Sequence, residues 1–243
     1  MAKLNRIAME LLRTSNKPEN IKGIAEKGYA YDYADYLVSV GDELPEVIYK
    51  WIAEKGNSQK TANLVLKMKA KDMEVSPDLI KNIVKTSLGA MAYAIEKYDF
   101  DPESEMEPEV FEAIVKDGNT VRQFIAEFIT KDIDATLIPL DKWNQFMDKM
   151  TPFIGADQLY YKLVKRLIEA KVIKGYKQIN RKAVETILKH EETVNKFAHF
   201  LLPYVNELPE EVKSKVTNQN ILKPDWRKVT KFEENFSNFF SKK

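Results

Sequence analysis

The residue types most able to do chemistry gather at positions 160–189, the most basic stretch of the chain. Nine Lys and Arg residues lie there against two acids, Glu169 and Glu185. Lysines can contact phosphates as point charges, and the interleaved Tyr160, Tyr161 and Tyr176 could stack on bases. We expect a solvated basic face here. The alternative is binding of a nucleic-acid backbone or another acidic partner, because lysines suit backbone contact better than the base-specific reading that Arg performs. The candidate binding residues are Lys162, Lys165, Arg166, Lys174, Tyr176, Lys177, Arg181 and Lys182.

An acidic stretch at residues 99–117 carries the carboxylate oxygens that calcium prefers. An EF-hand loop starting at Asp99 needs Gly at its sixth position and Glu at its twelfth. This chain has Ser104 and Val110 there, and Pro102 interrupts the loop. We therefore expect a solvated acidic linker, with docking of a basic partner as the alternative.

No local motif for catalysis or for a cofactor is present in the sequence. The two histidines, His190 and His199, are nine residues apart, which places them on roughly opposite faces of one helix. There is no cysteine, no glycine-rich phosphate loop, and no serine in a G-x-S-x-G motif. A Ser–His–Asp set built from distant segments, or a site made of acids alone, stays open. We expect no enzyme activity, no metal and no cofactor.

Residues 224–240 space their large apolar side chains as one stripe along a helix. We expect this stripe to pack back over the preceding helices. The alternative is a docking helix for a partner or for a second copy of the chain. The candidate docking residues are Trp226, Phe232, Phe236, Phe239 and Phe240.

The composition places the chain among globular proteins without a strong overall electric field. It has 243 residues, 44% of them hydrophobic, and a net charge of +1. No apolar run approaches the ~18 residues of a membrane span, and the N-terminus lacks the apolar core of a secretory signal. We therefore expect a cytoplasmic protein without a membrane partner. Only six of the 38 basic residues are Arg, which is typical of AT-rich genomes such as those of low-GC bacteria and their phages.

The elements that must position these residues are helices. Apolar residues recur at spacings of three and four, and glycines are scarce, at eight in the chain. Residues 18–28, 45–56 and 108–118 share one pattern: Pro followed by an acid starts a helix, and Ile followed four residues later by Gly ends it. Variants at Pro77 and Pro209 have Ser87 and Asn220 in place of Gly. The pattern predicts helix C-termini at Gly28, Gly56 and Gly118, and one buried row of Ile24, Ile52 and Ile114.

A second helix of about a dozen residues follows each of these glycines. Ala34, Ala62 and Phe124 lie six residues after the respective Gly and are expected on the same buried face. Farther along, the segment at 192–204 mirrors this second helix, and Ile187 mirrors Ile114. The mirrored residues are Thr193, Val194 and Phe197, against Thr120, Val121 and Phe124.

Residues 18–131 resemble, in this rhythm, short HEAT-like or related two-helix repeats. The resemblance implies stacked pairs that bury one another's apolar faces and offer an extended binding surface. General helix punctuation is the alternative reading of the same residues. We predict an all-α fold, with an irregular α-solenoid at 1–131 and a helical C-terminal part at 132–243 that could be continuous with it. Helices are expected from Pro139, from Gln158, and around residues 182–204.

These observations favour a non-enzymatic protein that binds another protein, as a scaffold, adaptor or inhibitor. A phage or mobile-element protein acting on a host factor is one setting that fits the Lys-rich composition. The second hypothesis is nucleic-acid binding through residues 160–189. A homo-oligomer stays open.

Overall fold

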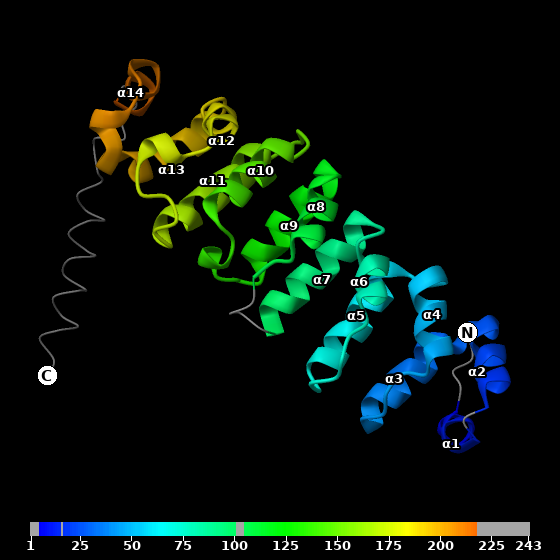
Figure 1. Cartoon of the computed structure of the whole chain (residues 1–243). Helices are drawn as coiled ribbons and strands as arrows, with labels where there is room; N and C mark the ends of the chain where they lie inside the picture. Colours follow the sequence, from blue (N-terminus) through cyan, green and yellow to red (C-terminus); the bar gives the residue numbers. More distant parts are fainter. Residues whose placement is uncertain (1–4, 16, 101–104, 218–243) are drawn as a thin grey trace, which may run out of the picture. The chain divides into compact units, whose positions relative to one another are not determined.

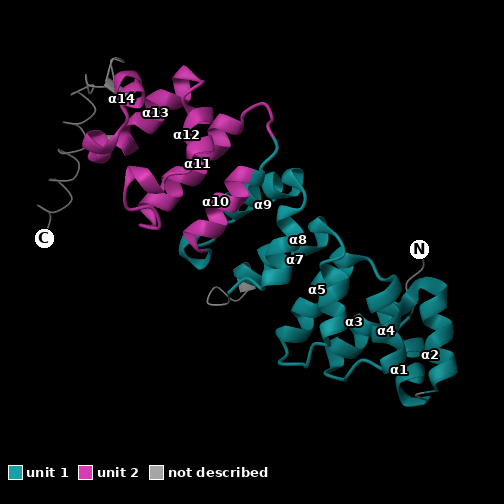
Figure 2. Cartoon of the chain, turned by 45° about the horizontal axis from the view of Figure 1, so that its top comes forward, with its two compact units in different colours: residues 1–138, 149–151 teal, residues 139–148, 152–243 magenta. Residues whose placement is uncertain are grey.

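The computed structural model describes residues 5–15, 17–100 and 105–217. All regular elements within these ranges are helices, which confirms the all-α prediction. The helices form two compact units (Figure 2): unit 1 comprises residues 1–138 and 149–151, and unit 2 comprises residues 139–148 and 152–243. Within the described ranges, no helix combines the length and apolar character needed to cross a membrane.

Unit 1 consists of a leading helix and four helix pairs (Figure 1). First helices contact first helices, α2 with α4 and α4 with α6. Second helices contact second helices, α3 with α5, α5 with α7, and α7 with α9. The bounds are α1 Arg6–Ser15, α2 Pro18–Ile24, α3 Ala30–Val40, α4 Glu46–Lys55, α5 Ser58–Lys69, α6 Pro77–Ile83, α7 Ser87–Phe100, α8 Pro108–Val115 and α9 Gly118–Thr130, with the π-turn η1 Ala25–Tyr29 and the 3-10 turn η2 Ala135–Leu137.

Unit 2 has longer connections between its helices and more 3-10 structure. Helix α11 packs against α12 and α13, and α13 packs against α14. Tyr160 on α11 donates a hydrogen bond from its hydroxyl to the carbonyl of Met147 on α10, at 2.8 Å. The bounds are α10 Leu140–Lys149, α11 Ala156–Glu169, η3 Tyr176–Gln178, α12 Arg181–Ile187, α13 Glu191–Leu201, η4 Leu202–Glu207 and α14 Glu210–Thr217.

The glycine predictions are confirmed at two positions and wrong at the third. Gly28 is left-handed, with φ of 88°, where the first helix of its pair ends. Gly56 is the residue that ends α4, although its backbone is extended. Gly118 instead begins α9, because Asp117 caps that helix by accepting hydrogen bonds from Asn119 N and Thr120 N. Ser87, the stand-in for Gly after α6, likewise begins α7.

Of the three isoleucines predicted to be buried on the first helices, one differs from the prediction. Ile52 and Ile114 are fully buried, as predicted. Ile24 is only half-buried, and Ile21 and Ala25 take the inward positions on α2 and η1. Residues four apart share a helix face, whereas a neighbour is rotated by about 100°. The inward face of the first pair is therefore shifted by one residue.

The second helices follow the predicted pattern closely. Ala34, Ala62 and Phe124 are each completely buried. In unit 2, Phe197 on α13 is buried as Phe124 is on α9, and Ile187 is buried as Ile114 is. The helix predicted around residues 182–204 is two helices, because the chain turns at Leu188–His190 and the His190 carbonyl accepts from Thr193 N and Val194 N to start α13.

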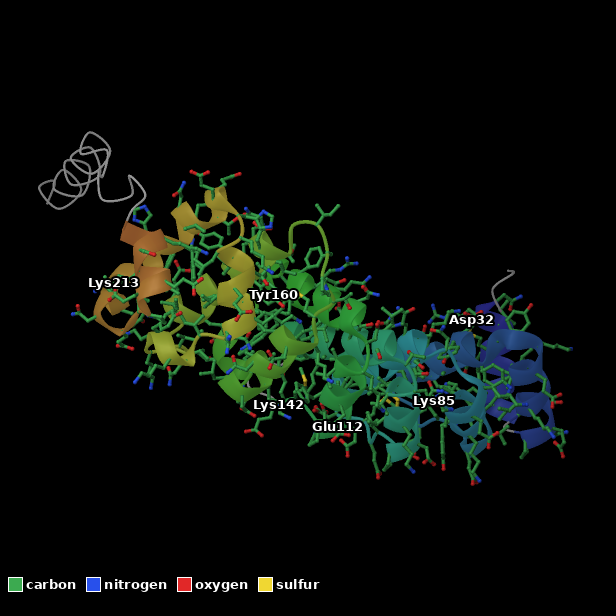
Figure 3. All side chains as sticks on the ribbon, turned by 90° about the horizontal axis from the view of Figure 1, so that it is seen from above. Asp32, Lys85, Glu112, Lys142, Tyr160 and Lys213 are labelled. Carbon is green, nitrogen blue, oxygen red and sulfur yellow. The ribbon has the colours of Figure 1, made fainter. Side chains whose placement is uncertain are left out.

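A buried amide ties three helices of unit 1 together. Asn82 on α6 donates from its Nδ2 to the carbonyls of Ala53 and Gly56, at 3.0 and 3.2 Å, at the end of α4. Its Oδ1 accepts from the Thr61 hydroxyl on α5, at 2.7 Å. Lys85, labelled in Figure 3, donates from its Nζ to the Ala53 carbonyl at 2.6 Å. Helix α4 thus has its C-terminal carbonyls satisfied by side chains that follow it in the chain.

Unit 2 has a related arrangement with different residues and one different acceptor. Asn180, the N-cap of α12, donates from its Nδ2 to Asp148 Oδ1 on α10 at 2.9 Å. Lys182 donates from its Nζ to the Asp148 carbonyl at 2.8 Å. The lysine of one pair therefore again caps the first helix of the preceding pair, whereas the amide binds a side chain of that helix.

Candidate interaction groove

A groove of about 660 Å³ opens in unit 2 where α12 faces α14. Its size is within the range of ligand pockets, roughly 300–1,000 Å³. The floor consists of aliphatic side chains, and the rim is charged. The floor residues are Ile179, Val184, Leu188, Pro209 and Val212, and the rim residues are Tyr176, Lys177, Arg181, Glu185, Lys189, Glu211 and Lys215.

The wall on the α12 side is held by the start of that helix. Asn180 accepts a hydrogen bond from Ala183 N at 3.1 Å through its Oδ1, and this cap fixes the first turn. Val184 and Leu188 are four residues apart and therefore share one face of the helix. Together with Ile179, which precedes the helix, they line the groove. Leu188 is half-buried and is the most accessible apolar residue on the α12 side of the floor.

The opposite wall is α14. Pro209 precedes this helix, and its carbonyl accepts from Lys213 N at 2.8 Å, which forms the first turn. Val212 points into the groove, with Glu211 and Lys215 at its edge. Helix α14 is seated on α13, so both walls belong to the same packed unit.

The rim carries more positive than negative charge. Four cations, Lys177, Arg181, Lys189 and Lys215, face two acids. Arg181 pairs with Glu185 at 2.7 Å on the surface, and this hydrogen bond raises the pKa of the guanidinium further. The three lysines form no ion pair with any residue that the structure describes. A ligand with negative charge would therefore find lysines that have not already been neutralised.

Tyr176 contributes a partly apolar surface at the groove edge. The ring is half-buried, and burial raises the pKa of its hydroxyl, so it stays a neutral hydrogen-bond donor at physiological pH.

The structure brings together only three of the eight basic-segment candidates. Tyr176, Lys177 and Arg181 line the groove, whereas Lys162 and Lys174 are exposed outside its lining. Lys182 is engaged with the Asp148 carbonyl. On α11, Arg166 is half-buried, and Lys165 lies over the Phe200 ring at 5.6 Å and near Glu169 at 3.7 Å.

Two of the tyrosines expected to stack on bases belong to the packing of unit 2. Tyr160, labelled in Figure 3, is only 2% exposed. Tyr161 makes an edge contact with Phe200, with ring centroids 6.1 Å apart. These two rings therefore support α11 against its neighbours, and only Tyr176 of the three reaches the groove.

Several groove residues were not predicted as site residues. Leu188 and Lys189 lie at the end of α12, and Val212 and Lys215 come from α14. No local spacing joins these two helices, so sequence alone gave no signal for their meeting. The predicted docking residues Trp226, Phe232, Phe236, Phe239 and Phe240 lie outside the described residues.

The histidines and the acidic stretch were the other candidates for chemistry. In the described residues there is no cluster of His, Asp and Glu suited to a metal, and both histidines are exposed. Part of the acidic stretch is not a solvated linker: Glu107 pairs with the nearly buried Lys97 at 2.9 Å. Burial alone would raise the pKa of Glu107, but hydrogen bonds from Lys97 and Tyr93 outweigh it and lower that pKa.

Comparison with known proteins gives no relative of this chain. No family model matches it, and neither the curated proteins nor the solved structures include a significant match.

Proposed function

We propose that this chain is a non-enzymatic protein-interaction module made of successive helix pairs, acting as a scaffold, adaptor or inhibitor. The contacts of first helices with first helices, and of second with second, support a repeat array in unit 1. The observation that carries the proposal is the groove of unit 2, with its aliphatic floor and charged rim. Such grooves commonly bind the apolar face of a helix.

The accessible floor residue on the α12 side gives the sharpest test. Leu188→Asp places a charge where a partner's apolar side chain would be desolvated, which should weaken binding by at least about tenfold. Leu88→Asp is the matched control, because Leu88 is 44% exposed and lies in unit 1. The measurement compares proteins retained from the source cell's lysate by tagged wild type and by both variants, followed by a titration with the retained partner. Equal binding of that partner to all three chains would contradict the proposal.

A nucleic acid is the second candidate ligand, and the three rim lysines without ion pairs favour it. In a gel-shift series, binding through phosphates should weaken steeply with salt and should be lost in Lys177→Glu/Lys189→Glu. Lys67→Glu/Lys71→Glu, on unit 1, changes the charge equally and is the control. Absence of a shift with both DNA and RNA at low salt would exclude this candidate.

A further inference from the structure

We propose that residues 224–240 of the chain itself occupy the groove of unit 2. The inference rests on the proposed function in one respect, since it assigns a regulator to the same groove that would bind a partner. The segment lies outside the described residues, and the case for it comes from the position of the groove, the connecting length and the chemistry of the two surfaces.

The connection is short and starts at the groove itself. Helix α14 forms one wall and ends at Thr217. The six residues 218–223 then precede the segment. Six extended residues reach about 20 Å, enough to turn back over the wall that they leave. A tether this short holds the segment near the groove at a millimolar effective concentration, so even modest affinity keeps it bound.

The apolar surfaces complement each other in kind. The floor is aliphatic throughout, from Ile179 and Val184 to Leu188 and Val212. The segment offers large aromatic side chains at helical spacing, among them Trp226 and Phe236. Aromatic side chains bury roughly 150–250 Å² each, so one or two of them would cover a large apolar area of the floor.

The charges also match on both edges. On a helix turning by about 100° per residue, Glu233 lies beside Trp226 on one side of the stripe. Lys228 lies beside Phe239 on the other side. Asp225, at the start of the segment, falls within the stripe. The rim of the groove offers lysines that pair with no acid of the described residues, and the acid Glu211. A helix bound in the groove can therefore place Glu233 near the rim lysines and Lys228 near Glu211.

This occupant would act as an internal competitor. A partner protein would have to displace the segment before it reached Leu188, so its apparent affinity would be lowered by the fraction of grooves left open. The groove would then respond to any modification or contact that draws residues 224–240 away.

The absence of cysteine from the chain allows a clean test in the full-length protein. Leu188→Cys with Phe236→Cys should form an intramolecular disulfide under mild oxidation, at least tenfold faster than Ile154→Cys with Phe236→Cys. Ile154 is fully exposed in unit 2 and does not line the groove, which makes it the matched control. Equal rates for the two pairs, or a disulfide that forms only between two chains, would overturn the proposal.

Hydrogen exchange on the otherwise unmodified chain provides a second readout that needs no cross-link. Amides of residues 224–240 and of α12 and α14 should exchange at least tenfold faster in Phe236→Asp than in wild type. Unchanged exchange at all three places would also overturn the proposal.

The two proposals can fail separately. A rapid disulfide in the Leu188/Phe236 pair, with no partner sensitive to Leu188→Asp, would retain the occupant and reject the partner site. Slow cross-linking, with a partner that is lost in Leu188→Asp, would reject the occupant and retain the partner site.

Discussion

Asn82→Ala should lower the free energy of unfolding of unit 1 by about 3 kcal/mol, because it leaves buried polar groups without partners. Asn82 is completely buried. Its amide links the Ala53 and Gly56 carbonyls of α4 to the Thr61 hydroxyl of α5. Lys85 still reaches the Ala53 carbonyl in the variant, so the main loss is at Gly56 and Thr61. Urea unfolding, with hydrogen exchange in α4 to α6 as the local readout, measures the change.

The control for this substitution is Asn63→Ala on α5, where the side chain is exposed. It should change stability by less than about 0.5 kcal/mol. Thr61→Val should cost less in the Asn82→Ala background than in wild type, because its partner is already gone. Stability of Asn82→Ala within about 0.5 kcal/mol of wild type would show that the amide does not hold these helices together.

Gly89→Ala should destabilise unit 1 by about 2 kcal/mol, although Ala is the better helix former by about 1 kcal/mol. A Cβ at this position of α7 would lie 2.5 Å from the Ser58 Cβ on α5 and 2.6 Å from the Ile83 carbonyl oxygen. The Ser58 Cβ and the Ile83 carbonyl oxygen cannot move aside without separating α7 from α5 and α6. The urea midpoint of the variant reports the effect.

Gly23→Ala is the matched control and should have the opposite sign. Gly23 lies inside α2, and a Cβ there would meet nothing within 4 Å. The substitution should stabilise the protein by about 0.5–1 kcal/mol through helix propensity. If both variants stabilised the chain, the close approach of α7 to α5 would be wrong.

The starts of helices were the most predictable part of this fold. Pro18, Pro77 and Pro108 each occupy the first turn of a helix, because a residue without an N–H loses nothing there. The ends were less predictable, since a residue between two helices can belong to either. Gly118 was assigned to the preceding helix, but Asp117 is a strong N-cap and draws it into α9.

Gly56 shows that a correct position can have a different cause. Gly is usually favoured at a helix end because it allows the left-handed conformation. The Gly56 backbone is extended instead, and a Cβ there would lie 2.3 Å from the Ile52 carbonyl oxygen and 2.4 Å from the Tyr31 hydroxyl. Lack of space requires Gly at this position, and only the packed structure reveals that.

Only part of the candidate groove could be predicted from the sequence. Charge density drew attention to Lys177 and Arg181, and both of them line it. The same criterion included Lys182, which caps a helix, because composition does not distinguish a lysine that binds a carbonyl from a free one. The floor depends on α12 meeting α14, a long-range contact that periodicity within one helix cannot encode.

Lys85 and Lys182 cap helices that precede them in the sequence, and this order matters for folding during translation. Lys85 follows Ala53, whose carbonyl it caps, by 32 residues, and Lys182 follows Asp148 by 34. A ribosome adds about 5–20 residues per second, so each capped helix emerges about 2–7 seconds before its cap. During that time its last carbonyls have only water as a partner. The pairs that begin with α4 and α10 are therefore each completed by the pair translated next, so the order of translation sets when these two helix ends are capped.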